Sequence, residues 1–169
     1  MLSAPANTDV VELILQDHRT MEDLFRTMRS NDADRAAALA EFSALLIAHA
    51  EAEESKIYPA LRRYKNVPDD DVEHGVHEHE EGNAALLALL EVEDTASDEW
   101  DEKLEELVSA INHHTDEEER TLLNEAREHV AAERRAELGR LFFEARAELL
   151  AADCGSIDNV RKIVDSGRR

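Results

Sequence analysis

Apolar side chains recur at steps of three and four residues along five stretches of the chain, which is the period of an amphipathic α-helix. Short polar segments with turn and helix-capping residues separate these stretches. The predicted helices cover about residues 9–30, 34–65, 71–93, 98–129 and 132–152. Pro59 interrupts the second stretch, so we expect a kink or a break there near Tyr58.

Four helices of roughly 20 residues or more with short loops predict an all-α fold, an antiparallel up-down four-helix bundle. The fifth helix is expected to lie along the outside of the bundle, packed through Leu138, Leu141, Phe142 and Leu149. After this helix the sequence becomes polar, so we expect residues 153–169 to form a loosely ordered C-terminal tail. The predicted organisation is therefore one helical domain over residues 1–152 followed by that tail.

Polar residues interrupt the first four apolar stripes near their middle. Each stripe carries one histidine there, and in two stripes a glutamate follows one turn later: His18, His49 with Glu53, His79, and His114 with Glu118. A lone histidine on an apolar face is commonly a hydrogen-bonded core residue, but six such groups without a cation would be costly to bury. Because a helix rises about 1.5 Å per residue, the positions match in height within about one turn. The six side chains can therefore converge on one layer.

Imidazole and carboxylate donors together suit iron, zinc or manganese. Six protein ligands with two carboxylates exceed what one tetrahedral zinc ion uses, and each carboxylate could bridge two metals. The pattern favours a dinuclear site, with iron as the first choice. The Glu-x-x-His motif of the ferritin-like di-iron proteins is absent from the sequence, which disfavours that class.

Four short motifs occur in order along the chain. They are Asp17-His18, His49 to Glu53 followed by Glu54-Ser-Lys-Ile-Tyr-Pro59, Glu78-His79, and His113-His114 to Glu118-Glu119, with Trp100 upstream of the last. Together they resemble the hemerythrin-like, or HHE, cation-binding family of the bacterial type, over roughly residues 9–150. The resemblance implies two irons bridged by Glu53, Glu118 and a solvent-derived oxo or hydroxo group. It also implies that His18 and His49 hold one iron, and His79 and His114 the other.

The third helix departs from the pattern of the animal oxygen carriers, which have two ligands there four residues apart. Four residues before His79 stands Gly75, which cannot ligate. On an ideal helix His74 and His77 point roughly 140° and 160° away from His79. We expect both to be solvated, although an irregular helix start would let either join the site.

Three further positions lie beside the pattern. His113 and His129 fall off the stripe and are expected at the surface or close behind the ligands. Asn124 stands where the family often has proline, so the fourth helix is expected to run on.

Charge and composition restrict the classes of partner that we expect for this protein. The sequence has 40 acidic and 19 basic side chains, a net charge of -21 with neutral histidine. Such a surface repels phosphate backbones and anionic lipid, which excludes nucleic acid and membrane as expected partners. The first ten residues lack the features of a signal peptide, no apolar run reaches roughly 18 residues, and Cys154 is the single cysteine. We therefore expect a cytoplasmic protein.

The leading functional hypothesis is a non-haem di-iron protein that binds or reacts with O₂, H₂O₂ or NO under oxidative or nitrosative stress. Slow catalase-like decomposition of peroxide is its candidate activity, with no catalytic residue beyond the metal ligands and an electron donor still to be identified. One alternative is an iron-storage, iron-delivery or metal-centre repair module. The other is a metal-free helical protein that binds partners through its acidic surface.

Overall fold

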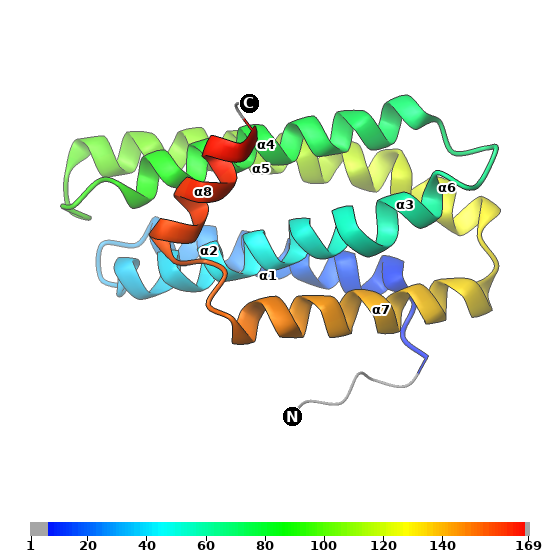
Figure 1. The fold of residues 1–169 in the computed structure, drawn as a ribbon. Coiled ribbons are helices and arrows are strands. Elements are labelled where there is room, and N and C mark those ends of the chain that lie inside the picture. Colours follow the sequence, from blue (N-terminus) through cyan, green and yellow to red (C-terminus); the bar gives the residue numbers. More distant parts are fainter. Residues whose placement is uncertain (1–6, 168–169) are drawn as a thin grey trace.

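A computed structural model of the protein describes residues 7–167, and within this range every regular element is a helix (Figure 1). The predicted all-α bundle is confirmed. Its four long helices are α1 Val10–Met28, α2 Arg35–Ala52, α4 Asp69–Leu90 and α5 Asp98–Arg120. None of the described helices combines the length and the apolar character that crossing a bilayer requires.

The helix α7, Ala132–Ala151, packs on α1 and α2 along the outside of the bundle, as predicted (Figure 1). Leu138 and Phe142 are buried in this contact, and Leu141 and Leu149 are partly buried. Gly139 makes the close approach possible, since a Cβ at this position would lie 2.0 Å from the carbonyl oxygen of Thr8.

The C-terminal segment differs from the loosely ordered tail that its polar composition predicts. Residues Ile157–Gly167 form helix α8, which packs against α4 (Figure 1). Val160 and Val164 are buried, and Ile163 is partly buried beside them. This apolar stripe consists of only three residues, so the polar composition of the segment did not predict a helix. Tertiary packing stabilises the helix.

The second predicted helix changes its geometry earlier than expected. It leaves the α-helical ladder after Ala52, passes through a π-helical turn at Glu53–Ile57, and resumes as α3, Tyr58–Leu61. Pro59 lacks an N–H, so the ladder must change here. The N–H of Tyr58 donates to the carbonyl of Glu53, five residues back, which accommodates one extra residue in the turn.

The fourth predicted helix is not continuous to His129. The helix is interrupted at Thr121, where φ is -105° and ψ is -87°, and α6 follows at Leu122–His129. The break aims Leu122 and Leu123 into the core. Asn124 keeps its place in α6 and its side-chain amide donates to the carbonyl of Arg120. Helical structure therefore continues past Asn124 to His129 as expected, but with a break at Thr121.

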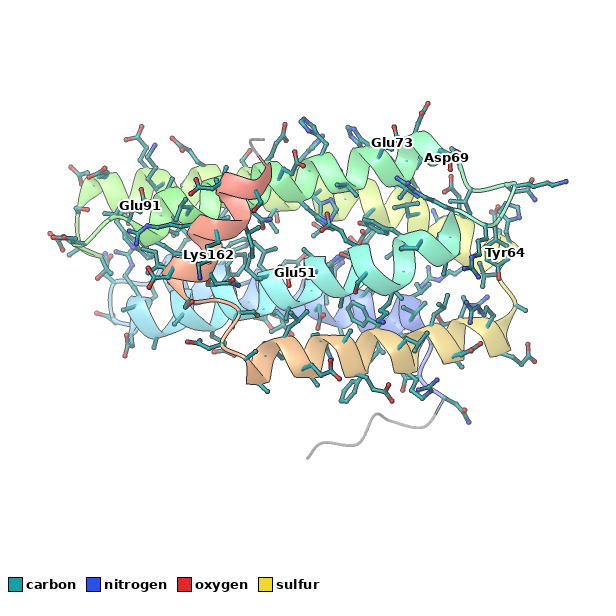
Figure 2. All side chains as sticks on the ribbon, in the orientation of Figure 1. Glu51, Tyr64, Asp69, Glu73, Glu91 and Lys162 are labelled. Carbon is teal, nitrogen blue, oxygen red and sulfur yellow. The ribbon has the colours of Figure 1, made fainter. Side chains whose placement is uncertain are left out.

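The core consists of two apolar clusters, one on each side of the layer of buried histidines. One cluster contains Phe25, Phe42 and Trp100, and the other contains Ile14, Leu122 and Phe142. The acidic side chains are mostly on the outside, where Asp69, Glu73 and Glu91 are exposed (Figure 2). Charged side chains outside and apolar clusters inside are usual for a helical bundle. The polar layer between the two clusters is the unusual feature.

Glu125 on α6 lies near Asp71 in the first turn of α4, and the burial of its carboxylate can be tested. Its Oε2 is buried without a hydrogen-bond partner, and burial together with the nearby Asp71 raises the pKa of Glu125 to about 7. The folded state therefore binds this proton more tightly than the unfolded chain, and stability is lost as pH rises from about 4.5 to 7. We expect Glu125→Gln to stabilise the protein at pH 8 by on the order of 1 kcal/mol, and by much less at pH 5.

Urea unfolding at both pH values, at fixed metal content, measures this difference. Glu133→Gln, an exposed glutamate near the start of α7, is the control and should change little. An equal gain from Glu125→Gln at pH 5 and pH 8 would show that the carboxylate carries no penalty.

Candidate metal centre

All six residues that the sequence singled out converge in the central layer. His18 comes from α1, His49 from α2, Glu53 from the first position of the π-helical turn, and His79 from α4, while α5 supplies His114 and Glu118. Each is at most 5% exposed. Their donor atoms form two overlapping groups, Glu53-His79-His114-Glu118 and His18-His49-Glu118, and within each group the atoms lie within 4.8 Å of one another.

Each carboxylate lies between two histidines that belong to different groups. Glu53 Oε1 is 2.9 Å from His49 Nε2 and 3.4 Å from His79 Nε2. On the other side, Glu118 Oε1 is 3.3 Å from His18 Nε2, and its Oε2 is 3.7 Å from His114 Nε2. Both carboxylates are thus placed to face two neighbouring positions at once.

The outer nitrogen of each histidine faces a carboxylate from another helix. The pairs are His49 Nδ1 with Asp17 at 2.8 Å, His79 Nδ1 with Glu54 at 3.2 Å, His114 Nδ1 with Glu78 at 3.3 Å, and His18 Nδ1 with Glu119 at 3.8 Å. A carboxylate at Nδ1 favours the proton on that nitrogen, which leaves the lone pair of Nε2 directed inward. His49, His79 and His114 thus have the support that metal-binding histidines usually have, whereas Nδ1 of His18 makes no hydrogen bond to Glu119.

Unpaired atoms test whether the layer fits a cation. Both carboxylate oxygens of Glu53, Oε1 of Glu118 and Nε2 of His18 and His49 are buried without a hydrogen bond. Some of these atoms are close neighbours, so their separation satisfies a hydrogen bond while their direction does not. Buried polar atoms without partners are rare in proteins, and lone pairs that converge on one point are what a cation requires. The donor set therefore fits metal ions.

Electrostatics within the layer are strongly coupled. Burial opposes charge on His49, but Glu53 and Asp17 outweigh it and raise the pKa of His49 well above its usual value. Burial likewise opposes the charge of Glu53, yet His49 and His79 hold the pKa of Glu53 well below its usual value. The pKa of His79 is raised to about 9, because Glu53 and Glu54 outweigh its burial. The same raised pKa values mean that a metal ion binding to these nitrogens would have to compete with protons.

The family comparison agrees with this geometry. The model of the hemerythrin HHE cation-binding domain matches residues 9–126. The chain belongs to this family. No curated protein and no solved structure matches it closely enough to count as a relative. The matched range of the HHE domain holds all six converging residues, while α7 and α8 lie outside it.

Tyr58 belongs to the centre of this HHE domain, although stepping along the stripe by three and four does not reach it. Its hydroxyl donates to Glu118 Oε2 at 2.5 Å, and its ring stacks on His79 with 5.6 Å between centroids. The extra residue in the π-helical turn rotates Tyr58 inward. Pro59 was the signal in the sequence, since it required a change of geometry at this place.

Gly75 makes the space that Tyr58 occupies. A Cβ at this position would lie 3.0 Å from the Tyr58 hydroxyl oxygen. The third-helix position at which the animal oxygen carriers have a second ligand is thus vacant here, and a tyrosine from α3 fills the gap.

The remaining histidines do not join the layer. The helix α4 is regular from Asp69, so His74 and His77 face outward with side chains 56% and 65% exposed. His113 is 62% exposed and His129 is 31% exposed. The predicted solvation of His74 and His77 agrees with these positions, and His113 lies at the surface, as expected, where it contacts Glu78.

Helix α7 contacts the centre through an ion pair and through a ring contact, in which Phe142 lies edge-on to His49 with 5.6 Å between the ring centroids. The guanidinium of Arg146 contacts the carboxylate of Asp17, which in turn holds His49. Burial opposes the charge of Asp17, but His49 and Arg146 keep its pKa below the usual value. A helix outside the matched range therefore helps to fix one histidine of the layer.

Asp17→Asn tests whether the outer carboxylates support metal binding. Loss of the charge at His49 Nδ1 weakens the basicity and the orientation of the ring, so we expect metal affinity to fall about 10–100-fold. Competition with a chromophoric chelator measures the affinity. Asp23→Asn, at an exposed position of the same helix, should leave it unchanged. Equal affinities for the two variants would contradict a supporting role of Asp17.

Tyr58→Phe tests the hydrogen bond to Glu118. The ring still fills its space, but the buried carboxylate loses a donor, which we expect to cost about 1–3 kcal/mol of unfolding free energy. Urea denaturation measures the change, with Tyr64→Phe, which lies away from the layer, as the control. If both variants lose the same stability, the Tyr58 bond contributes nothing specific.

Proposed function

We propose that this HHE domain holds two iron ions and binds or reacts with O₂, H₂O₂ or NO in the response to oxidative or nitrosative stress. The observation that carries the proposal is the pair of overlapping donor groups, which share Glu118 and have Glu53 between them. One group offers His18 and His49, and the other offers His79 and His114. When bound, an iron pair supplies one-electron redox chemistry and coordination positions for a small molecule.

A very small internal cavity restricts what can reach the four histidines from within the core. It measures about 10 Å³ and is lined by the histidines together with Met21, Leu46, Ile111 and Thr115. That volume is close to the space one water molecule needs. The apolar wall and the small size favour diatomic gases and peroxide over larger ligands.

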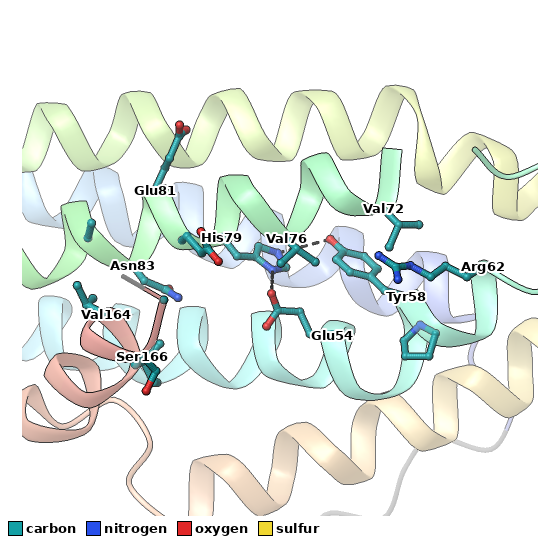
Figure 3. Close-up of a pocket in the computed structure, with 15 residues that line it drawn as sticks. Glu54, Tyr58, Arg62, Val72, Val76, His79, Glu81, Asn83, Val164 and Ser166 are labelled. Atoms are coloured by element: carbon teal, nitrogen blue, oxygen red, sulfur yellow. Dashed lines mark hydrogen bonds and ion pairs between the residues drawn. The ribbon is translucent and has the colours of Figure 1, made fainter. Parts of the chain in front are cut away.

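A larger cavity of about 720 Å³ lies beside the His79 end of the site (Figure 3). It lies between α3, α4 and α8, and its wall includes Glu54, Tyr58 and His79. In the close-up Glu54 and Tyr58 are both directed toward His79 (Figure 3). Because His79 lines both cavities, we propose that small molecules approach the centre past this side chain.

Two side chains at this wall can hold protons next to a reacting small molecule. Burial, followed by the charge of Glu118, raises the pKa of Tyr58 well above 10, so its hydroxyl remains a donor to Glu118. Glu54 is half-buried and accepts from His79 Nδ1. These two polar side chains at the wall of an accessible cavity support reactive chemistry over the stable carriage of dioxygen.

Metal analysis of protein purified from iron-supplied cells without chelator tests the proposal. We expect about two irons per chain, with charge-transfer absorption in air that changes on addition of H₂O₂ or NO, because the two donor groups accommodate one ion each. His114→Ala should reduce the iron content and the metal-linked stability. His129→Ala, remote from the layer, is the matched control.

Three results would overturn this function. A single zinc per chain, or no metal, would remove the dinuclear site. Iron-loaded protein whose spectrum ignores O₂, H₂O₂ and NO would remove the reactivity. Unchanged or improved stability of His114→Ala at full metal loading would favour a metal-free interaction protein.

A further inference from the structure

A second group of metal-binding side chains lies on the surface between α4 and α5. His74 and Glu78 are one turn apart on α4, and His113 extends from α5. Glu78 Oε2 is 3.0 Å from His113 Nε2 and 3.6 Å from His74 Nε2. The three donor atoms all lie within 4.8 Å of one another.

Glu78 is the buried member of this surface group. Its side chain is only 4% exposed, and Oε2 is buried without a hydrogen-bond partner. The other oxygen, Oε1, lies 3.3 Å from His114 Nδ1. One carboxylate therefore joins the buried centre through Oε1, while Oε2 is directed toward the two outer histidines.

The spacing of the donors matches metal coordination. In a tetrahedral site with bonds of about 2.0–2.1 Å, neighbouring ligand atoms lie about 3.3–3.4 Å apart. The two contacts of Glu78 Oε2 lie on either side of that value. His74 and His113 are more than half exposed, so their rings can close on an ion without disturbing the core.

A narrow cleft leads from this surface group to the buried layer. It measures about 20 Å³, room for one water-sized particle, and His74, Glu78, His114 and Glu118 all line it. Asp71 and Glu117 also line the cleft, so its walls are acidic and attract cations.

We propose that His74, Glu78 and His113 form a surface site for one divalent cation of the zinc, cobalt or ferrous class, from which the buried centre is loaded. Two imidazoles and a carboxylate are the donors that such borderline ions prefer, and water completes the coordination. The loading role rests on the proposed function of the centre, whereas the binding of a surface cation does not.

Co²⁺ titration of the metal-depleted full-length chain tests both parts. The variant His74→Ala/His113→Ala should bind one Co²⁺ fewer per chain by equilibrium dialysis, because the centre keeps its six donors. Its remaining Co²⁺ should appear about tenfold more slowly in the visible absorption spectrum, since the local supply of cations is gone. The control His77→Ala/His129→Ala removes two other outward-facing histidines and should leave the number and the rate unchanged.

The outcomes separate this proposal from the buried centre. Equal Co²⁺ numbers in the double variant and the unmodified chain would overturn the surface site while leaving the centre intact. One Co²⁺ fewer at an unchanged rate would overturn the loading role. Retention of a single Co²⁺ that only the His74→Ala/His113→Ala variant loses would support the surface site and count against the dinuclear centre.

Discussion

A layer of ionisable side chains buried between two apolar clusters is the constraint on which this bundle depends. Burial of such groups costs free energy unless each finds a partner of opposite charge. Here every outer partner comes from the neighbouring helix: Asp17 faces His49, Glu54 faces His79, Glu78 faces His114, and Glu119 faces His18. These contacts close a ring around the four helices, so the order and the height of the helices are determined together with the geometry at the centre.

The helix stripes and the six converging side chains could be predicted because both follow from one period. A histidine in an apolar stripe, such as His114, is placed by the same 3.6-residue repeat that places the leucines around it. The outer carboxylates could not be assigned this way. Asp17 stands next to His18 in the sequence, yet a step of about 100° turns it toward another helix, where it contacts His49. Its role depends on which helix lies beside α1.

Local departures from the helical period are the second reason why parts of the structure could not be predicted from the sequence. The break at Thr121 leaves Leu122 buried, where a step of four from Glu118 already places it. The π-helical turn instead brings Tyr58 inward, and there a tertiary contact outweighs the regular ladder, so a count along the stripe assigns the wrong face. The same holds for α8, where Val160 and Val164 gain enough burial to fold a segment whose composition is that of a tail.

The two helices beyond the matched family range act on the centre in different ways. Arg146 of α7 reaches the layer through Asp17 and thereby adds a positive charge behind His49. Val164 of α8 lines the cavity whose wall includes His79, so α8 bounds one side of that cavity. The four-helix layer supplies the donors common to its architecture, and the added helices bear on the electrostatics and the access of this particular chain. A version of the chain without α7 and α8 would therefore keep all six donors, but would lose the positive charge behind His49 and one wall of the cavity beside His79.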